Sequence, residues 1–281
     1  MTVRTFTWRE ADGTETALSD ANGYSVLADV KGLDAPPVTN TIEDYISLDG
    51  AALTGRRRNV RSVLLPLHVK HPTRVQSRIE ELTAMLLATG ELAVSDGTNS
   101  RALRDVVYEA GLEGDLARGS AMPTWRKVVL SLLALDPWWY GDAVAVSLPV
   151  AAETAFDAAL AFDSVLPFDG GASVATTVVG HAEAFPVITV VGPATVVTVG
   201  NGEQTWQTAV ALMASDTLIV DTRPGHRGPR RNGGNVDWSL LTAASRLWTL
   251  TPGLRSVIVG VVGSTGATSV GLTYEPRWST P

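Results

Sequence analysis

The chain of 281 residues contains no cysteine. Without cysteine it can form no disulfide, thiolate zinc site, iron–sulfur cluster or thiol nucleophile. No run of 18 apolar residues occurs, which argues against a transmembrane helix and leads us to expect no membrane insertion. The polar side chains Arg4, Arg9 and Glu10 near the start argue against a secretory signal.

The sequence also lacks an excess of basic residues. It has 22 lysines and arginines against 29 acidic residues, a formal net charge of −7. Proteins that recognise a nucleic acid sequence usually carry a strongly basic surface, so we expect no such partner. Hydrophobic residues make up 45% and charged residues 18% of the chain, a balance that predicts a folded protein.

Known catalytic patterns are missing as well. The chain has no Gly-x-Ser-x-Gly, His-Glu-x-x-His, phosphate-binding loop or Gly-x-Gly-x-x-Gly. His68 and His71 are close in sequence, but no carboxylate lies within eight residues to complete a metal site. A pair of carboxylates acting as a glycosidase stays an open but disfavoured alternative. We therefore predict no enzyme, with no catalytic, cofactor-binding or metal-binding residue and no cofactor.

One segment has a clear helical pattern. Pro72 suits the first turn of a helix and Gly90 suits its stop, which predicts a helix over Pro72–Thr89. The apolar residues between them recur every three or four positions, at Val75, Ile79, Leu82, Met85 and Leu86. This pattern indicates an amphipathic helix with one face on a core.

Most of the remaining sequence predicts strands. Val60–Val69 would place Val63, Leu65, Leu67 and Val69 on one face of a strand, with Pro66 suggesting an edge or a bulge. Ala102–Tyr108 and Trp125–Leu135 are further strand candidates. Beyond residue 140, short β-branched runs alternate with turn residues, and Asn201-Gly202 predicts a hairpin. These runs are Ala143–Val150, Ala175–Val179, Phe185–Val191, Thr195–Val199, Thr205–Leu212, Thr217–Val220, Leu247–Leu250, Ser256–Val262 and Ser269–Tyr274, with a short helical turn near Leu240–Ala244.

The distribution of these elements predicts two domains. The only strong helix lies before residue 140, and the nine short strands after it are typical of a β-sandwich or barrel. We place an α+β domain at residues 1–140 and an all-β domain at 141–281.

A short repeat, in which Phe-Asp recurs every six residues, falls near the start of the second domain. Its phenylalanines, Phe156, Phe162 and Phe168, would share one face of an extended strand. The segment either lies on its own domain or reaches over a neighbouring subunit.

Arginine clusters and tryptophans are the candidate contact residues. We interpret the clusters as solvated loops or subunit contacts, because no aromatic residue interleaves them as nucleic acid stacking would require. The first contains Arg56, Arg57, Arg58 and Arg61, and the second Arg227, Arg230 and Arg231. Trp206, Trp238 and Trp248 could stack on sugars, although core packing is the favoured use of tryptophan.

Five segments, in order along the chain, carry a resemblance to one family. They are Trp125–Leu130 running into Ala134–Gly141, then Ala184–Gly192, Thr217–Thr222, Trp248–Arg255 and Gly271–Trp278. Together the chain resembles the siphophage distal tail proteins, the Dit-like family of tail components. It departs from the family at Arg255, where asparagine is frequent.

The resemblance implies a mainly β fold with two parts. Residues 1–140 would form a ring or belt domain, a β-sandwich with one helix and a β-hairpin, and residues 141–281 a galectin-like β-sandwich. Such a protein is a structural component of the virion at the distal end of the tail, assembled in the host cytoplasm. Two surfaces are candidates for contacts between copies, roughly Val26–Val69 and the Phe-Asp segment.

The same resemblance implies the partners. Copies of the chain would form a homohexameric ring that joins the tail tube to the tail-tip hub or baseplate. The tail-tube protein, a hub or tail-associated protein and the tape measure protein are the expected neighbours. The alternative is a carbohydrate-binding module that contacts the host surface. Gly225–Asn232 does not match the sugar-binding pattern of galectins, so we assign no carbohydrate-binding residue.

Overall fold

The structure is a computed structural model that describes residues 4–19, 22–46, 49–113, 121–150 and 172–281. Contacts divide the chain into two compact units, each described by itself below. Residues 1–142 and 278–281 form the first unit, and residues 143–277 form the second. The sequence division at residue 140 had placed the last four residues with the second part, whereas here they pack with the first.

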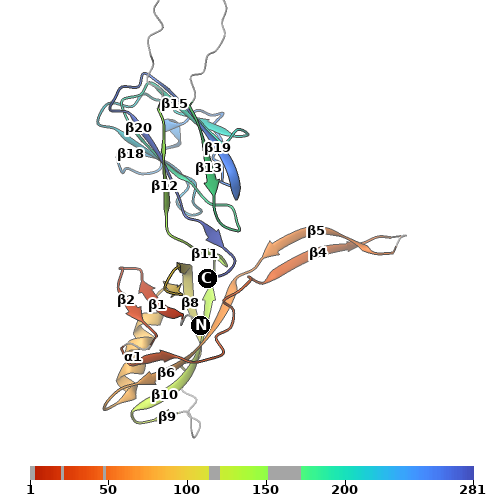
Figure 1. Ribbon diagram of the computed structural model, residues 1–281, viewed down its shortest axis with the longest axis vertical. Coiled ribbons are helices and arrows are strands. Elements are labelled where there is room, and N and C mark those ends of the chain that lie inside the picture. Colours follow the sequence, from red (N-terminus) through yellow and green to blue (C-terminus); the bar gives the residue numbers. More distant parts are fainter. Residues whose placement is uncertain (1–3, 20–21, 47–48, 114–120, 151–171) are drawn as a thin grey trace, which may run out of the picture. The chain divides into compact units, whose positions relative to one another are not determined.

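The first unit is built on one large antiparallel sheet (Figure 1). Its strands are β1 (Thr5–Glu10), β2 (Glu15–Ala17), β3 (Tyr24–Val26), β6 (Arg61–Lys70), β7 (Gly90–Ser95), β8 (Ser100–Ala110), β9 (Ala121–Met122), β10 (Trp125–Ala134), β11 (Trp139–Tyr140) and β21 (Arg277–Trp278). The main path runs β2–β1–β7–β8–β10–β6–β3, and the three short strands β9, β11 and β21 lie off this path. Three of these strands, β6, β8 and β10, correspond to the predicted segments Val60–Val69, Ala102–Tyr108 and Trp125–Leu135.

The pair β6–β10 forms the centre of this sheet. Alternate residues of both strands are buried, because side chains in a strand point to opposite faces. Pro66 lies opposite Val129 of β10, and its carbonyl accepts the N–H of Leu27 on the other side. The nitrogen of Pro66 therefore points to the same side as its carbonyl, away from β10. The pairing with β3 ends at Leu67, so the missing N–H of Pro66 removes no hydrogen bond between paired strands.

The predicted helix is present but shorter. α1 covers Val75–Leu86, and the five apolar residues of the predicted stripe are its buried residues. The N-cap of α1 is Arg74, which makes no side-chain capping bond; in the turn just before the helix, His71 Nδ1 accepts the backbone N–H of Arg74 at 3.0 Å. Gly90, predicted as the stop, instead opens β7, where an added Cβ would lie 2.5 Å from the Trp8 ring. Close packing on Trp8 therefore requires glycine there.

The second unit is a sandwich of two antiparallel sheets (Figure 1). One has the order β12–β20–β14–β17–β18 and the other β13–β19–β15–β16. Their bounds are β12 (Val144–Leu148), β13 (Ala172–Val178), β14 (Val187–Val191), β15 (Val196–Gly200), β16 (Thr205–Gln207), β17 (Thr217–Asp221), β18 (Gly228–Arg231), β19 (Gly253–Val262) and β20 (Ser269–Tyr274). A single cluster of buried apolar side chains from both sheets forms its core.

The fold class is therefore confirmed as mainly β, with an α+β first part and an all-β second part. The hairpin at Asn201-Gly202 is present between β15 and β16. Leu247–Leu250 is not a strand, and Leu250 makes only an isolated bridge to Ala184. β18 was not predicted, because it lies in a segment whose glycines and prolines are typical of a loop. The expected helical turn lies slightly earlier, as the 3₁₀ helix η1 (Trp238–Leu240).

Candidate functional site

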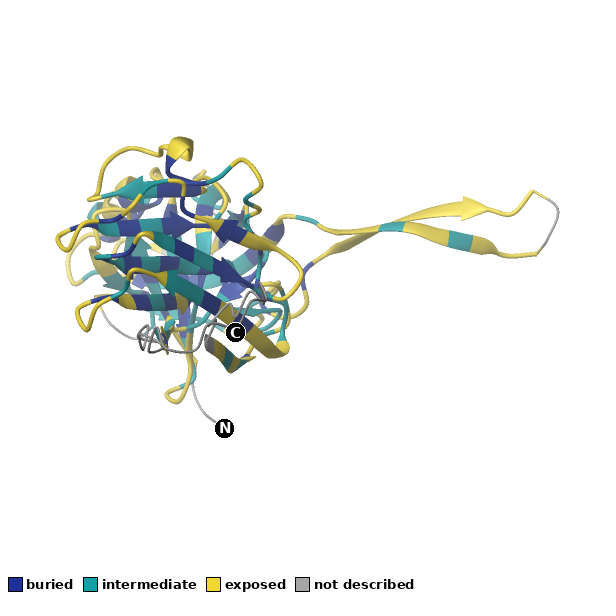
Figure 2. Ribbon diagram, turned by 90° about the horizontal axis from the view of Figure 1, so that it is seen from above, coloured by how far each residue is buried: buried dark blue, intermediate teal, exposed yellow. Residues whose placement is uncertain are grey.

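A two-stranded hairpin extends from the first unit and is its most exposed element. It consists of β4 (Val38–Asp44) and β5 (Ala51–Arg58), which pair only with each other. Figure 2 shows both strands almost entirely in the colour of exposed residues. We call residues 38–58 the arm. It falls within the region Val26–Val69, which was predicted to be a contact surface between copies.

The arm carries large apolar side chains that are mostly exposed. Ile42 and Leu53 face each other across the two strands, and they are 61% and 60% exposed. Tyr45 and Ile46 continue the exposed apolar surface toward the far end. An isolated hairpin is only marginally stable in water, and an exposed apolar patch on it is typical of a contact surface.

Charge is unevenly distributed along the arm. Arg56 and Arg57 lie where the arm joins the unit, opposite Asn40 and Thr39. The acidic residues Glu43 and Asp44 lie farther out, opposite Ala52 and Ala51. The arm therefore has a basic root and an acidic outer part.

The first arginine cluster was predicted to lie in a solvated loop or a subunit contact. Arg61 does not fit this prediction, because only 1% of its surface is exposed. Its guanidinium donates to five backbone carbonyls, those of Gly32, Leu33, Asp34, Pro137 and Ser279. It also lies 5.7 Å from the centre of the Trp139 ring. Burial lowers the pKa of Arg61 to about 10, which leaves it charged at neutral pH. Arg61 thus joins three distant segments instead of facing solvent.

Its neighbour Arg58 also has an internal contact, because its guanidinium lies 4.5 Å from the centre of the Trp138 ring. Arg58 is nevertheless an exposed residue, as are Arg56 and Arg57. The spacing of these four arginines in the sequence could not show which of them have internal contacts. The adjacent pair Trp138-Trp139 could have suggested such contacts, because the two rings can each bind a cation.

The second arginine cluster lies on and beside β18. Arg231 forms an ion pair with the buried carboxylate of Asp216, which also accepts hydrogen bonds from Asn232 and from the backbone N–H of Met213. These interactions, led by Arg231, hold the pKa of Asp216 well below its usual range. Arg230 lies 4.0 Å from Asp221. Arg231 and Arg230 therefore make contacts that stabilise the fold. Of the three arginines, only Arg227 lines a cavity.

The three candidate tryptophans differ in burial. Trp206 and Trp248 are core residues, with 1% and 2% of their surface exposed. Trp238 is 55% exposed and lies on η1, where the side chain of Asp237 accepts the backbone N–H of Ser239 at 3.0 Å. Only Trp238 of the three is therefore available for a ligand.

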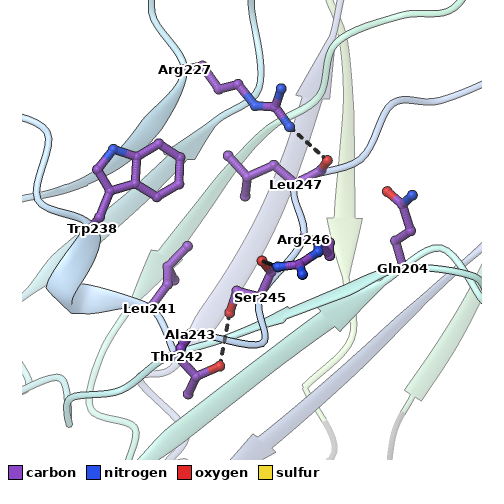
Figure 3. A pocket seen from close by; sticks show the side chains of 9 residues that line it. All are labelled: Gln204, Arg227, Trp238, Leu241, Thr242, Ala243, Ser245, Arg246 and Leu247. Carbon is purple, nitrogen blue, oxygen red and sulfur yellow. Dashed lines mark hydrogen bonds between the residues drawn. The ribbon is translucent and has the colours of Figure 1, made fainter.

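Trp238 borders a cavity of about 470 Å³ in the second unit. Figure 3 shows Trp238 and Leu241 on one side in this view, Gln204 and Arg246 on the other, and Arg227 above. The remaining lining residues are Thr242, Ala243, Ser245 and Leu247. Arg227 donates to the carbonyl of Leu247 at 3.0 Å. The lining includes two arginines and no carboxylate.

The histidines do not form a site. His68 packs edge-on against Trp125, with ring centres 5.4 Å apart, while His71 accepts the backbone N–H of Arg74 in the turn before α1. Burial, with smaller contributions from Lys70 and Lys127, lowers the pKa of His68. Within the described residues, no group of three or more metal-binding side chains comes together. The Phe-Asp repeat at Phe156, Phe162 and Phe168 lies outside the described residues.

No protein-family model and no curated protein sequence matches this chain. Among solved structures, it matches the SPP1 Dit protein with a TM-score of 0.69 at 18% identity, covering 98% of this chain and 99% of that one. The chain has the Dit fold. That Dit protein is described as a paradigm of the hub adsorption apparatus in phages infecting Gram-positive bacteria.

A second match is to a structure of the phage P2 baseplate in its activated conformation. A chain of that assembly matches with a TM-score of 0.59 at 9% identity, over 99% of this chain and all of that one. The resemblance to Dit predicted from five sequence segments is thus confirmed at the level of the fold. Among the described residues of this Dit-fold chain, no helix has the length and apolarity needed to span a membrane.

Proposed function

We propose that this chain is a structural protein of a siphophage tail, located at the distal end of the virion tail and without enzymatic activity. The observation that carries the proposal is the match to SPP1 Dit over nearly the full length of both chains. A match confined to one unit would fit any protein that shares a sandwich. Here both units are matched within one chain, which favours the same kind of role.

In this proposal six copies form a ring that joins the tail tube to the tail-tip hub, as the family resemblance implies. A closed ring uses two different patches on each subunit, each meeting its counterpart on the next copy. The arm supplies one patch, because Ile42, Tyr45, Ile46 and Leu53 expose apolar surface on it. A second copy of this chain covers that surface, and tail-tube, hub and tape measure proteins bind the ring.

The test is the mass of the assembled protein in solution, measured by light scattering with and without the cognate tail-tube protein. The expected particle has six times the 29.7 kDa mass of one chain. The double variant Ile42→Thr/Leu53→Thr keeps residues suited to strands but removes the apolar pair, so it should stay monomeric.

The matched control is Leu254→Thr, an exposed strand residue of the second unit. It should assemble like the unaltered chain. A protein that remains monomeric even with tail-tube protein present would contradict the proposal. So would assembly that persists unchanged in the arm variant, because the arm would then not be the contact.

A further inference from the structure

The cavity beside Trp238 has the chemistry of a ligand site, and this feature is independent of ring assembly. An exposed indole offers a flat apolar face to a ligand, and its surroundings offer hydrogen-bond donors. The cavity lies entirely within the second unit, so no neighbouring part of the chain is needed to complete it. We propose that it binds a saccharide that carries carboxylate or phosphate groups.

The position of Trp238 is fixed by its surroundings. Leu240 and Leu241, which follow it, are buried and anchor η1 to the core. Gly228 lies behind the indole, because an added Cβ would come within 3.4 Å of Trp238 Cζ2 and 2.4 Å of Val236. The indole is therefore held against the backbone of β18 while more than half of its surface stays exposed. A prepositioned ring of this kind binds with little loss of conformational entropy.

The charge of the lining selects an acidic ligand. Arg227 and Arg246 each donate to a backbone carbonyl, those of Leu247 and Ser245, which holds them at the cavity. A guanidinium has five N–H donors, so each arginine keeps donors for a ligand anion. These two cations face a cavity without acidic lining, in a chain whose net charge is −7. Gln204 adds an amide that can bind a sugar hydroxyl.

A saccharide fits this surface better than single-stranded nucleic acid, which also stacks on aromatic rings. Nucleic acid sites track the backbone through a basic groove with several stacking platforms. Here one tryptophan lines one cavity. The bases would have a single platform, whereas one sugar ring with its anionic substituent matches one indole and two guanidinium groups.

The experiment titrates the full-length chain with two pairs of matched saccharides by calorimetry. The first pair is an oligogalacturonate and its methyl ester, and the second is a phosphorylated dextran oligosaccharide and the unmodified one. We expect at least one anionic form to bind and both neutral forms to bind about tenfold more weakly or not at all. The pairs distinguish carboxylate from phosphate as the preferred group, and added salt should weaken either.

Variants then locate the site. Trp238→Ala should weaken binding about tenfold and Trp238→Phe less. Arg227→Gln and Arg246→Gln should weaken the anionic forms and leave the neutral forms unchanged. Arg255→Gln is the matched control, since Arg255 is also exposed and also donates to backbone carbonyls, those of Thr251 and Pro252. It should bind as the unaltered chain does.

Three results would overturn the proposal. The first is no binding of any anionic saccharide at about 10 mM, a concentration that detects even very weak sites. The second is equal affinity for charged and neutral forms, or for Trp238→Ala and the unaltered chain. The third is tighter binding of an oligothymidylate than of every saccharide, which would assign the site to nucleic acid.

Discussion

At the scale of single residues, Arg61 shows how backbone carbonyls stabilise a buried cation. Five carbonyl oxygens replace the water that burial removes. The charge of Asp34 also favours the protonated guanidinium and partly offsets the lowering of its pKa by burial. Arg61→Met removes all five donated bonds at once. We expect it to lower the free energy of unfolding by about 2–4 kcal/mol, because the buried carbonyls lose their donor.

Chemical denaturation followed by tryptophan fluorescence measures this loss. Arg61→Lys should recover only part of the stability, since an ammonium group has three donors and cannot reach five acceptors. Arg56→Met, an exposed residue of the arm, should change stability by less than about 0.5 kcal/mol. Equal stability of Arg61→Met and Arg56→Met would contradict the role assigned to Arg61.

Asp216 gives a second prediction, about pH. Its folded-state pKa lies below the value of an unfolded aspartate, so its ionised form stabilises the fold above about pH 4. This contribution is lost as the pH falls through the folded pKa. We therefore expect Asp216→Asn to destabilise the second unit at pH 7, and the difference from the unaltered chain to shrink at pH 3.

Thermal unfolding at both pH values measures this effect. Glu203→Gln removes one exposed carboxylate from the same unit and serves as the control for the change in net charge. A destabilisation by Asp216→Asn that is the same at pH 3 and pH 7 would show that the carboxylate's charge is not responsible.

At the scale of elements, the arm has a polarity that a head-to-tail assembly can use. If the acidic outer part of one arm binds the basic root of the arm on the next copy, assembly requires the charges of both parts. Reversing the root with Arg56→Glu/Arg57→Glu, or the outer part with Glu43→Arg/Asp44→Arg, should each weaken assembly. Combining all four changes should restore it, because the attraction is then rebuilt with opposite signs. Light scattering at low salt measures assembly, and a quadruple variant no better than either double variant would contradict this contact.

Elements whose apolar residues repeat regularly were predicted from the sequence better than elements that depend on contacts with residues far away in the chain. The stripe from Val75 to Leu86 repeats every three or four residues and predicted the buried face of α1. The end of the helix was placed too late, since Gly90 is required by contact with Trp8, which is 82 positions earlier in the chain. β18 was missed because its Gly228 and Pro229 are typical of turns, and its pairing with β17 decides its structure.

Candidate site residues show the same limit. Composition suggested sugar stacking by tryptophan but could not rank Trp206, Trp238 and Trp248, because exposure depends on the tertiary fold. Trp206 alternates with exposed neighbours along β16, so its burial follows from strand period. The exposure of Trp238 had no such pattern. It follows from a 3₁₀ turn that buries the next residues, Leu240 and Leu241.

At the scale of the whole molecule, the chain begins and ends in the same unit. Residues 143–277 form the second unit, and residues 278–281 then return to the first. Trp278 packs against the core of the first unit, with Arg101 4.1 Å from the centre of its ring. Arg61 and Arg101 donate to the carbonyls of Ser279 and Thr280. The last four residues therefore contribute to the stability of the first unit.

Removing residues 278–281 should therefore destabilise the first unit and leave the second unchanged. We expect the melting temperature of the first unit to fall by roughly 5 °C, as lost packing of one tryptophan and two hydrogen bonds would produce. Calorimetry measures it, and Arg61→Met and Asp216→Asn mark which transition belongs to which unit. Trp278→Ala should reproduce most of the loss, while a Gly-Ser extension after Pro281 should cost nothing. A truncation that shifts only the transition marked by Asp216 would mean that the terminal residues stabilise the second unit instead.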